Sequence, residues 1–296
     1  MQQWIDIHFT ARDGLKLYAR HYPVPGARRR PLVCLAGLTR NSRDFHDLAV
    51  ALATPDANGR PVYALDYRGR GRSEHDPNWR NYSILVELND VLDFMIVKRL
   101  HHAAVIGTSR GGILAMLMAV IRPAAVAAVV LNDIGPVIEH EGLARIAAYV
   151  GRLPLPRDWV EATRIVRDIN QRQFPAVPEP QWAELARQIF NDDNGLPSAG
   201  YDPALAKALA QMGQTLPELW PQLAALAQLP VLVLRGEHSD ILSAATVEDM
   251  RRRHPRLEAV TVSGQGHAPL LKDAVSIATI ADFLRRADMA AAAVAA

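Results

Sequence analysis

The segment 105–112 constrains this chain more than any other. It reads Val-Ile-Gly-Thr-Ser-Arg-Gly-Gly and places Ser109 between two glycines. The apolar run 103–106 before it is typical of a buried strand, and the apolar run 113–120 after it is typical of a buried helix. A chain that passes so abruptly from strand to helix must turn sharply, and the glycines remove side chains that would collide there. The pattern predicts a strained turn that lifts the Ser109 hydroxyl above a sheet edge.

Strand and helix patterns alternate on both sides of this segment. The stretches 4–10 and 15–20 alternate apolar and polar residues around a turn, which predicts an antiparallel hairpin at a sheet edge. The later strands are short apolar runs separated by helical patterns such as 82–98, which predicts a mostly parallel sheet with helices on both faces. We expect these later strands at 31–35, 61–65, 103–106, 124–131, 230–235 and 257–262.

The rhythm changes between the fourth and fifth of these strands. From 136 to 227 helical patterns follow one another, separated by proline and glycine, and no clear strand intervenes. Such an insertion indicates a cap over the ends of the strands. We therefore expect a core domain made of 1–135 and 228–296, with a helical cap at 136–227.

A serine hydroxyl is a weak nucleophile and needs a base within hydrogen-bond reach, which is in turn oriented by an acid. Residues just after the carboxyl ends of parallel strands are the natural candidates, since ligands bind there. His267 follows the last strand in Gly-Gln-Gly-His-Ala-Pro, and Asp240 follows the strand before it in Gly-Glu-His-Ser-Asp. Glu237 and Asp133 are alternatives for the acid: Glu237 lies closer to the glycine, and Asp133 ends the strand at 124–131.

The order Ser…Asp…His, the Gly-x-Ser-x-Gly turn and the helical insertion together resemble the α/β-hydrolase fold superfamily. The segment 66–73, Asp-x-Arg-Gly-x-Gly-x-Ser, is similar to a turn that many capped members carry. We expect its Asp66, Arg68 and Ser73 to tie that turn together rather than to react. The resemblance covers nearly the whole chain apart from the cap.

The resemblance implies a role for each candidate. Ser109 would attack an acyl carbon, His267 would take its proton, and Asp240 would fix the imidazole. The backbone N–H groups of Arg110 and Leu38 would form the oxyanion hole. The loop 36–39, Ala-Gly-Leu-Thr, lacks the His-Gly pair common in relatives, but a backbone donor needs no particular side chain.

Three residues are candidate substrate contacts by position: Thr39, Arg40 and Asp133. Arg40 and Arg110 flank the expected oxyanion hole, and together they could recognise a carboxylate on the substrate. The alternative is that Arg110 pairs with an internal carboxylate such as Asp133 or Asp66. Aromatic residues of the cap, Trp159, Phe174, Trp182 and Tyr201, would either line an acyl pocket or pack the helices.

Composition limits the partners and the compartment. The net charge of +2 is small and scattered over 296 residues, which favours neither a nucleic-acid nor a membrane partner. The single cysteine, Cys34, lies in an apolar run and is compatible with a reducing compartment. No signal-peptide pattern or long apolar run is visible, so we expect a cytoplasmic protein. No clustered Cys/His set or phosphate-binding glycine loop predicts a metal or cofactor.

These observations favour a serine hydrolase of the carboxylesterase kind, acting on a small-molecule ester or lactone. Ser109, His267 and Asp240 would also serve a lactonase or a C–C bond hydrolase. A receptor built on this scaffold could retain them for sensing. Steady turnover of p-nitrophenyl esters distinguishes an enzyme from a receptor. The pattern leaves open whether the protein is a monomer or a homodimer.

Overall fold

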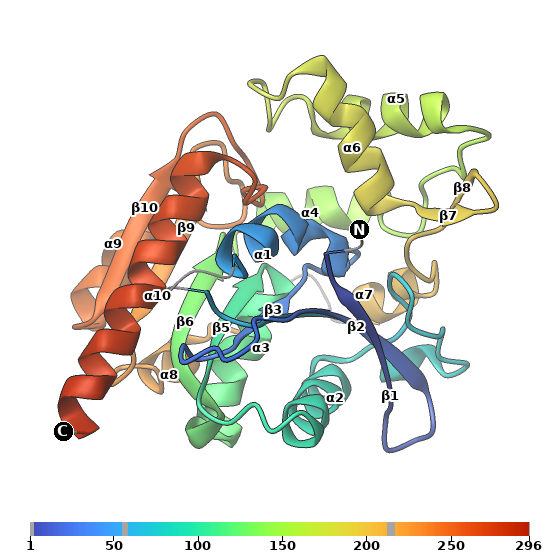
Figure 1. Cartoon of the computed structure of the whole chain (residues 1–296). Helices are drawn as coiled ribbons and strands as arrows, with labels where there is room; N and C mark the ends of the chain where they lie inside the picture. The colour runs from blue at the N-terminus through green and yellow to red at the C-terminus, as the bar shows by residue number, and fades with distance from the viewer. Residues whose placement is uncertain (1–2, 55–58, 212–216, 296) are drawn as a thin grey trace.

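The computed structural model describes residues 3–54, 59–211 and 217–295. Its centre is a twisted eight-stranded sheet in which six neighbouring strands are parallel, β4, β3, β5, β6, β9 and β10, while β2 is antiparallel to both of its neighbours (Figure 1). The spatial order of the strands is β1 (Ile5–Thr10), β2 (Lys16–Tyr22), β4 (Val62–Asp66), β3 (Leu32–Leu35), β5 (Ala103–Thr108), β6 (Val126–Asn132), β9 (Val231–Gly236) and β10 (Leu257–Val262).

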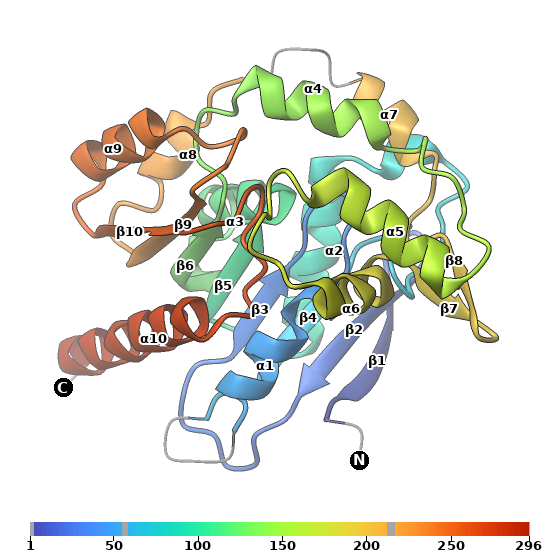
Figure 2. The ribbon, with the colours of Figure 1, turned by 90° about the horizontal axis from the view of Figure 1, so that it is seen from above.

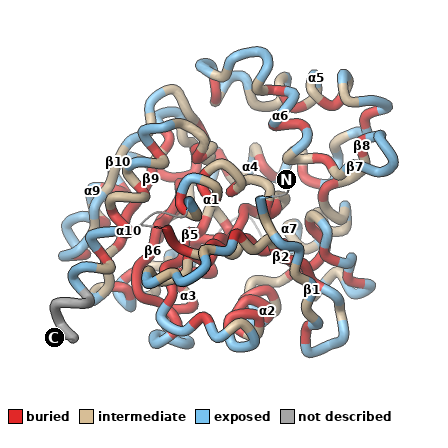
Figure 3. Tube along the Cα trace, in the orientation of Figure 1, coloured by how far each residue is buried: buried red, intermediate tan, exposed pale blue. Residues whose placement is uncertain are grey.

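Helices cover both faces of this sheet, so its central strands are buried and continuously apolar (Figures 2 and 3). On one face, α1 (His46–Leu52) and α10 (Ala274–Ala295) pack on the sheet. On the other, α2 (Ile84–Val97), α3 (Arg110–Ile121) and α9 (Ala244–Arg253) do so. The predicted α/β fold class is confirmed. Short 3-10 turns are η1 (Ser42–Phe45), η2 (Trp79–Asn81) and η3 (Pro123–Ala125).

The chain between β6 and β9 is mostly helical. Its elements are α4 (His140–Tyr149), α5 (Trp159–Asn170), α6 (Glu179–Ile189), β7 (Asn191–Asp193), β8 (Leu196–Ser198), α7 (Leu205–Gln211) and α8 (Trp220–Ala224). The expectation that no strand intervenes is wrong, because β7 and β8 pair around an Asn194-Gly195 turn in which both residues have positive φ. Residues 212–216 of the predicted cap lie outside the described part, and the boundaries 136–227 stay a prediction.

Arg43 fastens this region to the core. Its guanidinium donates to the backbone oxygens of Gln188 (3.0 Å) and Phe190 (3.3 Å) at the end of α6 and to the side chain of Asn191 (2.9 Å). Cations are favourable at a helix C-terminus, where carbonyl groups lack partners within the helix. This contact holds α6 above the loop that follows β3.

The turn after β4 is tied together by side-chain-to-backbone bonds. The buried carboxylate of Asp66 accepts from the backbone N–H groups of Ser42 (2.6 Å) and Arg72 (2.8 Å). Gly71 has φ +57°, and a Cβ there would lie 2.1 Å from Asp66 Oδ2, so only glycine fits. Ser73 donates to the carbonyl of Asp66 at 2.7 Å. The contacts of Asp66 and Ser73 agree with the predicted structural role, whereas Arg68 bonds Asp90 of α2 and Asp13, outside the turn.

Within the described residues, none of the helices is both long enough and apolar enough to cross a membrane.

Candidate active site

Ser109 occupies the sharp turn between β5 and α3. Its backbone has φ 51° and ψ −114°, a region that side-chain-bearing residues rarely adopt. A Cβ at Gly107 would lie 2.3 Å from the backbone of Gly111, and one at Gly111 would lie 2.1 Å from the carbonyl oxygen of Leu35. The two glycines therefore let strand and helix approach closely enough to hold the strained serine above the sheet, as the motif predicts.

His267 lies in the loop after β10, and its ring joins Ser109 to an aspartate. Its Nε2 is 2.9 Å from Ser109 Oγ, and its Nδ1 is 2.8 Å from Asp133 Oδ2. A carboxylate can only accept a hydrogen bond, so Nδ1 carries the proton and Nε2 is left to accept from the serine hydroxyl. This arrangement can move a proton from Ser109 to His267 during nucleophilic attack.

Asp133 follows β6 directly and its side chain is fully buried. Besides His267, its carboxylate accepts from the backbone N–H of Gly236 (2.7 Å) and from the hydroxyl of Ser239 (2.6 Å). Three donors therefore fix the carboxylate on both oxygens. A group held in this way can orient an imidazole.

The expectation that Asp240 contacts His267 is wrong. The turn after β9 instead presents Ser239 to Asp133, and Asp240 forms a bidentate pair with Arg145 of α4 at 2.5 and 2.9 Å. Burial raises the pKa of Asp240, but Arg145, a hydrogen bond from Gln173 and the charge of His267 together outweigh it, and the net pKa is lowered. The rival Glu237 is exposed and accepts from Ser263 and Gly264 of the next loop. Of the three carboxylates considered, Asp133 is the one bonded to His267.

Of the two residues predicted to form the oxyanion hole, Arg110 directly follows Ser109, and Leu38 lines the same pocket as Ser109. The N–H of Arg110 is the first of α3, for which the helix offers no internal acceptor. Gly37 approaches the nucleophile so closely that a Cβ on it would be 3.8 Å from the Cβ of Ser109. The Gly37 carbonyl accepts from the N–H of Arg40 (3.2 Å), and the N–H of Leu38 in the same trans peptide points the opposite way.

The Arg110 side chain does not reach the pocket. Its Nε donates to Glu87 of α2 at 2.5 Å, and the whole side chain is buried. It therefore pairs with an internal carboxylate, although with neither Asp133 nor Asp66. Sequence reasoning missed Glu87, which lies on the buried, mostly apolar face of the amphipathic helix α2.

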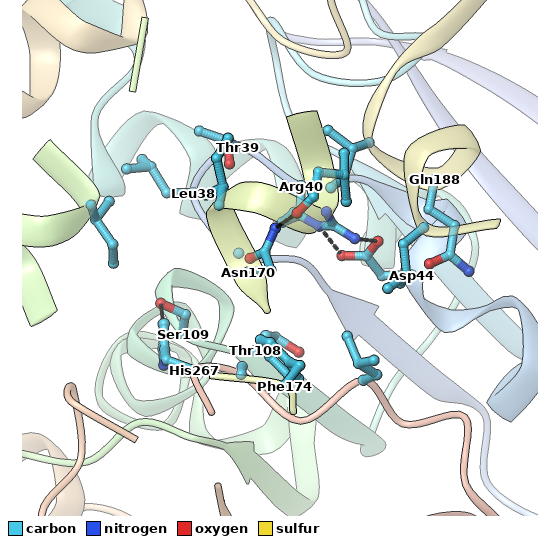
Figure 4. Close-up of a pocket in the computed structure, with 18 of the residues that line it drawn as sticks. Leu38, Thr39, Arg40, Asp44, Thr108, Ser109, Asn170, Phe174, Gln188 and His267 are labelled. Atoms are coloured by element: carbon cyan, nitrogen blue, oxygen red, sulfur yellow. Dashed lines mark hydrogen bonds and ion pairs between the residues drawn. The ribbon is translucent and has the colours of Figure 1, made fainter. Parts of the chain in front are cut away.

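A pocket opens above Ser109 and His267 between the core and the helical region. Figure 4 shows these two residues at one end, while Arg40, Asp44, Asn170 and Gln188 lie away from them. Arg40 and Asp44 form a bidentate pair at 2.8 and 2.5 Å. The helical region contributes mainly apolar and aromatic walls: Ile146, Tyr149, Leu153, Val166, Ile169, Phe174, Trp182, Leu185, Ile189 and Tyr201.

Not all of the residues predicted to contact the substrate or to line the pocket do line it. Thr39 and Arg40 line the pocket, whereas Asp133 lies beneath His267. Phe174 and Trp182 both line the pocket and belong to a small hydrophobic core between α5 and α6. Trp159 faces elsewhere, with its indole N–H bonded to the carbonyl of Gly195 at 2.9 Å.

Comparison with known proteins places the chain in a family. Residues 30–274 match the model of the alpha/beta hydrolase fold family. A 3-hydroxybutyrate-oligomer hydrolase of Cupriavidus necator is 32% identical over 91% of this chain and 93% of its own. A 2-(acetamidomethylene)succinate hydrolase of Mesorhizobium japonicum is 28% identical over 78% of this chain and 79% of its own.

The structural comparison agrees. The crystal structure of an alpha/beta hydrolase from Novosphingobium aromaticivorans superimposes with a TM-score of 0.89 at 38% identity, covering 97% of this chain and 99% of the other. The protein belongs to the α/β-hydrolase fold family, and its class is that of a hydrolase.

Proposed function

We propose that this protein is a serine hydrolase that cleaves carboxylic esters through an acyl-enzyme intermediate. The observation that carries the proposal is the hydrogen-bonded chain from Ser109 Oγ through His267 to Asp133 at the base of the pocket. Ser109 attacks the ester carbonyl, and His267 takes its proton and then delivers it to the departing alcohol. Asp133 holds the imidazole and stabilises its protonated form.

The negative charge that develops on the carbonyl oxygen is met by the backbone N–H groups of Leu38 and Arg110. Removal of one such donor typically costs about 3 kcal/mol of transition-state stabilisation. Water then attacks the acyl carbon while His267 takes its proton; the bond between the acyl carbon and Ser109 Oγ breaks, His267 returns the proton to Oγ, and the acid product leaves.

The pocket favours an ester of modest size that carries a second polar group. The apolar walls suit a short aliphatic segment, while the Arg40–Asp44 pair offers a donor and an acceptor without net charge. Such a pair suits a hydroxyl or a further ester better than a free carboxylate. The hypothesis that Arg110 recognises a carboxylate on the substrate is not supported, because its guanidinium is bonded to Glu87.

A hydroxyacyl oligoester combines these features, and the relative from Cupriavidus necator is named for hydrolysis of 3-hydroxybutyrate oligomers. We therefore propose short hydroxyalkanoate esters as the substrate class.

A substrate panel tests the proposal. It contains p-nitrophenyl acetate and butyrate, a γ-lactone, and the dimer and trimer of 3-hydroxybutyrate, each assayed with wild type and with Ser109→Ala. We expect steady turnover of the esters and oligomers, abolished in the variant. A single burst without turnover would indicate a receptor, and cleavage of the lactone alone would contradict the preference for linear esters.

A further inference from the structure

Three buried charges lie directly behind the proposed oxyanion hole. Glu87 is fully buried and receives Arg70 Nη1 at 2.7 Å on one oxygen and Arg110 Nε at 2.5 Å on the other. Burial opposes ionisation of Glu87, but the two arginines outweigh it and its pKa is lowered. The carboxylate thus bridges the turn after β4 to the beginning of α3.

The same arginine reaches the other side of the hole. Arg70 Nε donates to the backbone carbonyl of Leu38 at 2.8 Å, and its Nη1 also donates to the carbonyl of Arg68 at 2.7 Å. The carbonyl of Leu38 belongs to the peptide that follows the Leu38 N–H. Since the preceding peptide is already held by the Gly37–Arg40 turn, both peptides that flank the Leu38 Cα are fixed.

Stability alone gives little reason for such a cluster. Arg70 is completely buried, and its Nη2 has no hydrogen-bond partner among the described residues. A buried charge with an unpaired N–H is costly, and well-packed apolar side chains of similar volume are often no less stable. The arrangement does, however, connect the Leu38 loop to Arg110 at the beginning of α3, through Arg70 and the carboxylate of Glu87.

We propose that Arg70 is a positioning residue that sets the spacing of the two oxyanion donors, with Glu87 coupling it to Arg110. The inference rests on the proposed function, since it assumes that Leu38 and Arg110 hold the oxyanion. Arg70 touches no reacting atom. It holds the Leu38 loop at the distance from α3 that the tetrahedral intermediate requires.

The turn supplies a matched control two residues away. Arg68 is equally buried, and its side-chain hydrogen bonds to described residues go to Asp90 at 2.8 Å, Asp76 at 2.5 Å and Asp13 at 2.8 Å, not to the Leu38 loop. Its loss removes a comparable buried ion cluster from the same segment. Any effect shared by the two arginines is therefore structural.

The experiment measures the rate at which a fluorophosphonate labels Ser109, followed by intact-protein mass spectrometry, because that reaction needs the nucleophile and the oxyanion hole but not the natural substrate. We expect Arg70→Met to slow labelling about tenfold to a hundredfold, less than outright loss of a donor. The kcat for p-nitrophenyl butyrate falls in parallel, and KM stays within about threefold. Arg70→Lys recovers part of the rate, since a single ammonium does not reproduce the two fixed positions, Nε and Nη1, from which Arg70 bonds Leu38 and Glu87.

Arg68→Met, or Arg68→Lys if the first variant does not fold, lowers the melting temperature but labels at the wild-type rate when assayed below its melting transition. The inference is overturned if Arg70→Met labels as fast as wild type, or if the Arg68 variant slows as much as the Arg70 variant while folded. A wild type that is not labelled at Ser109 overturns the proposed function itself, and this inference with it.

Discussion

The loops that follow β6 and β9 start from neighbouring strands and each carries an aspartate, yet the two carboxylates have different partners. Asp133, after β6, is fully buried and bonded to His267, Ser239 and Gly236. Asp240, after β9, is partly exposed and bonded to Arg145 of the helical region. One carboxylate is bonded to the imidazole that contacts Ser109, and the other ties the helical region to the core.

A position just after a strand therefore identifies a residue as a candidate acid, but it does not decide which candidate contacts His267. The end of β9 and the loop after it still support the site. The N–H of Gly236 and the hydroxyl of Ser239 both donate to Asp133, which follows the neighbouring strand β6. The β9 loop's own aspartate, one residue further on, points to α4. Each loop therefore contributes, one with the acceptor and the other with the donors that hold it.

The largest expected effect is that of Asp133→Asn, which should lower kcat by about 10⁴ because an amide no longer fixes the productive imidazole tautomer. Steady-state kinetics on p-nitrophenyl butyrate measure it, and circular dichroism checks the fold. Activity within tenfold of wild type would show that Asp133 does not orient His267 and would contradict the contrast drawn with Asp240.

The hydroxyl of Ser239 should contribute less. Ser239→Ala removes one of the three hydrogen bonds to the Asp133 carboxylate, and a hydrogen bond to a charged group is typically worth about 1.5–3 kcal/mol. Because His267 still holds the carboxylate, we expect a fall in kcat of roughly tenfold with KM nearly unchanged. Pre-steady-state acylation kinetics would locate the loss in the chemical step. An unchanged acylation rate would show that the β9 loop does not support Asp133.

Asp240→Asn should leave kcat within about threefold and should lower the stability of the folded chain by less than about 1 kcal/mol, as for a partly exposed ion pair. Urea unfolding of this variant beside Arg145→Met measures the contribution. The two single variants and the double variant should lose about the same stability if the pair acts as a unit. A large fall in kcat in Asp240→Asn would indicate that Asp240, and not Asp133, is the acid that orients His267.

The smallest effect concerns pH. The folded-state pKa of Asp240 is lowered although burial opposes this, because Arg145 stabilises the ionised form. The unfolded carboxyl then binds its proton first, so the pair stabilises the fold above about pH 4 and this contribution disappears as the pH falls through the lower folded value. The stability difference between wild type and Asp240→Asn should shrink with acidification below pH ~4. A difference that grows on acidification would contradict the ion pair.

Much of this molecule could be predicted from local pattern. The strand–turn–helix at Ser109, the alternation that builds the sheet and the placement of His267 after the last strand all depend on residues near one another in the chain. The contact of His267 with Ser109 follows from the fold, since the carboxyl ends of parallel strands share one edge.

The choice of the acid could not be predicted in this way. It depends on the adjacency of β6 and β9 and on the turn that directs Ser239, rather than Asp240, toward Asp133. Likewise, Glu87 reaches Arg110 only because α2 and α3 lie side by side on one face of the sheet. The β7–β8 hairpin did carry a local signal, Asn194-Gly195, which the helical pattern around it obscured.

The proton on Nδ1 of His267 tests the central claim most directly. A proton shared with a buried carboxylate gives a far-downfield resonance in the ¹H NMR spectrum, which His267→Ala assigns by its loss. We predict that this resonance persists in Asp240→Asn and disappears or moves far upfield in Asp133→Asn. The opposite pattern, with the resonance lost only in Asp240→Asn, would contradict the account.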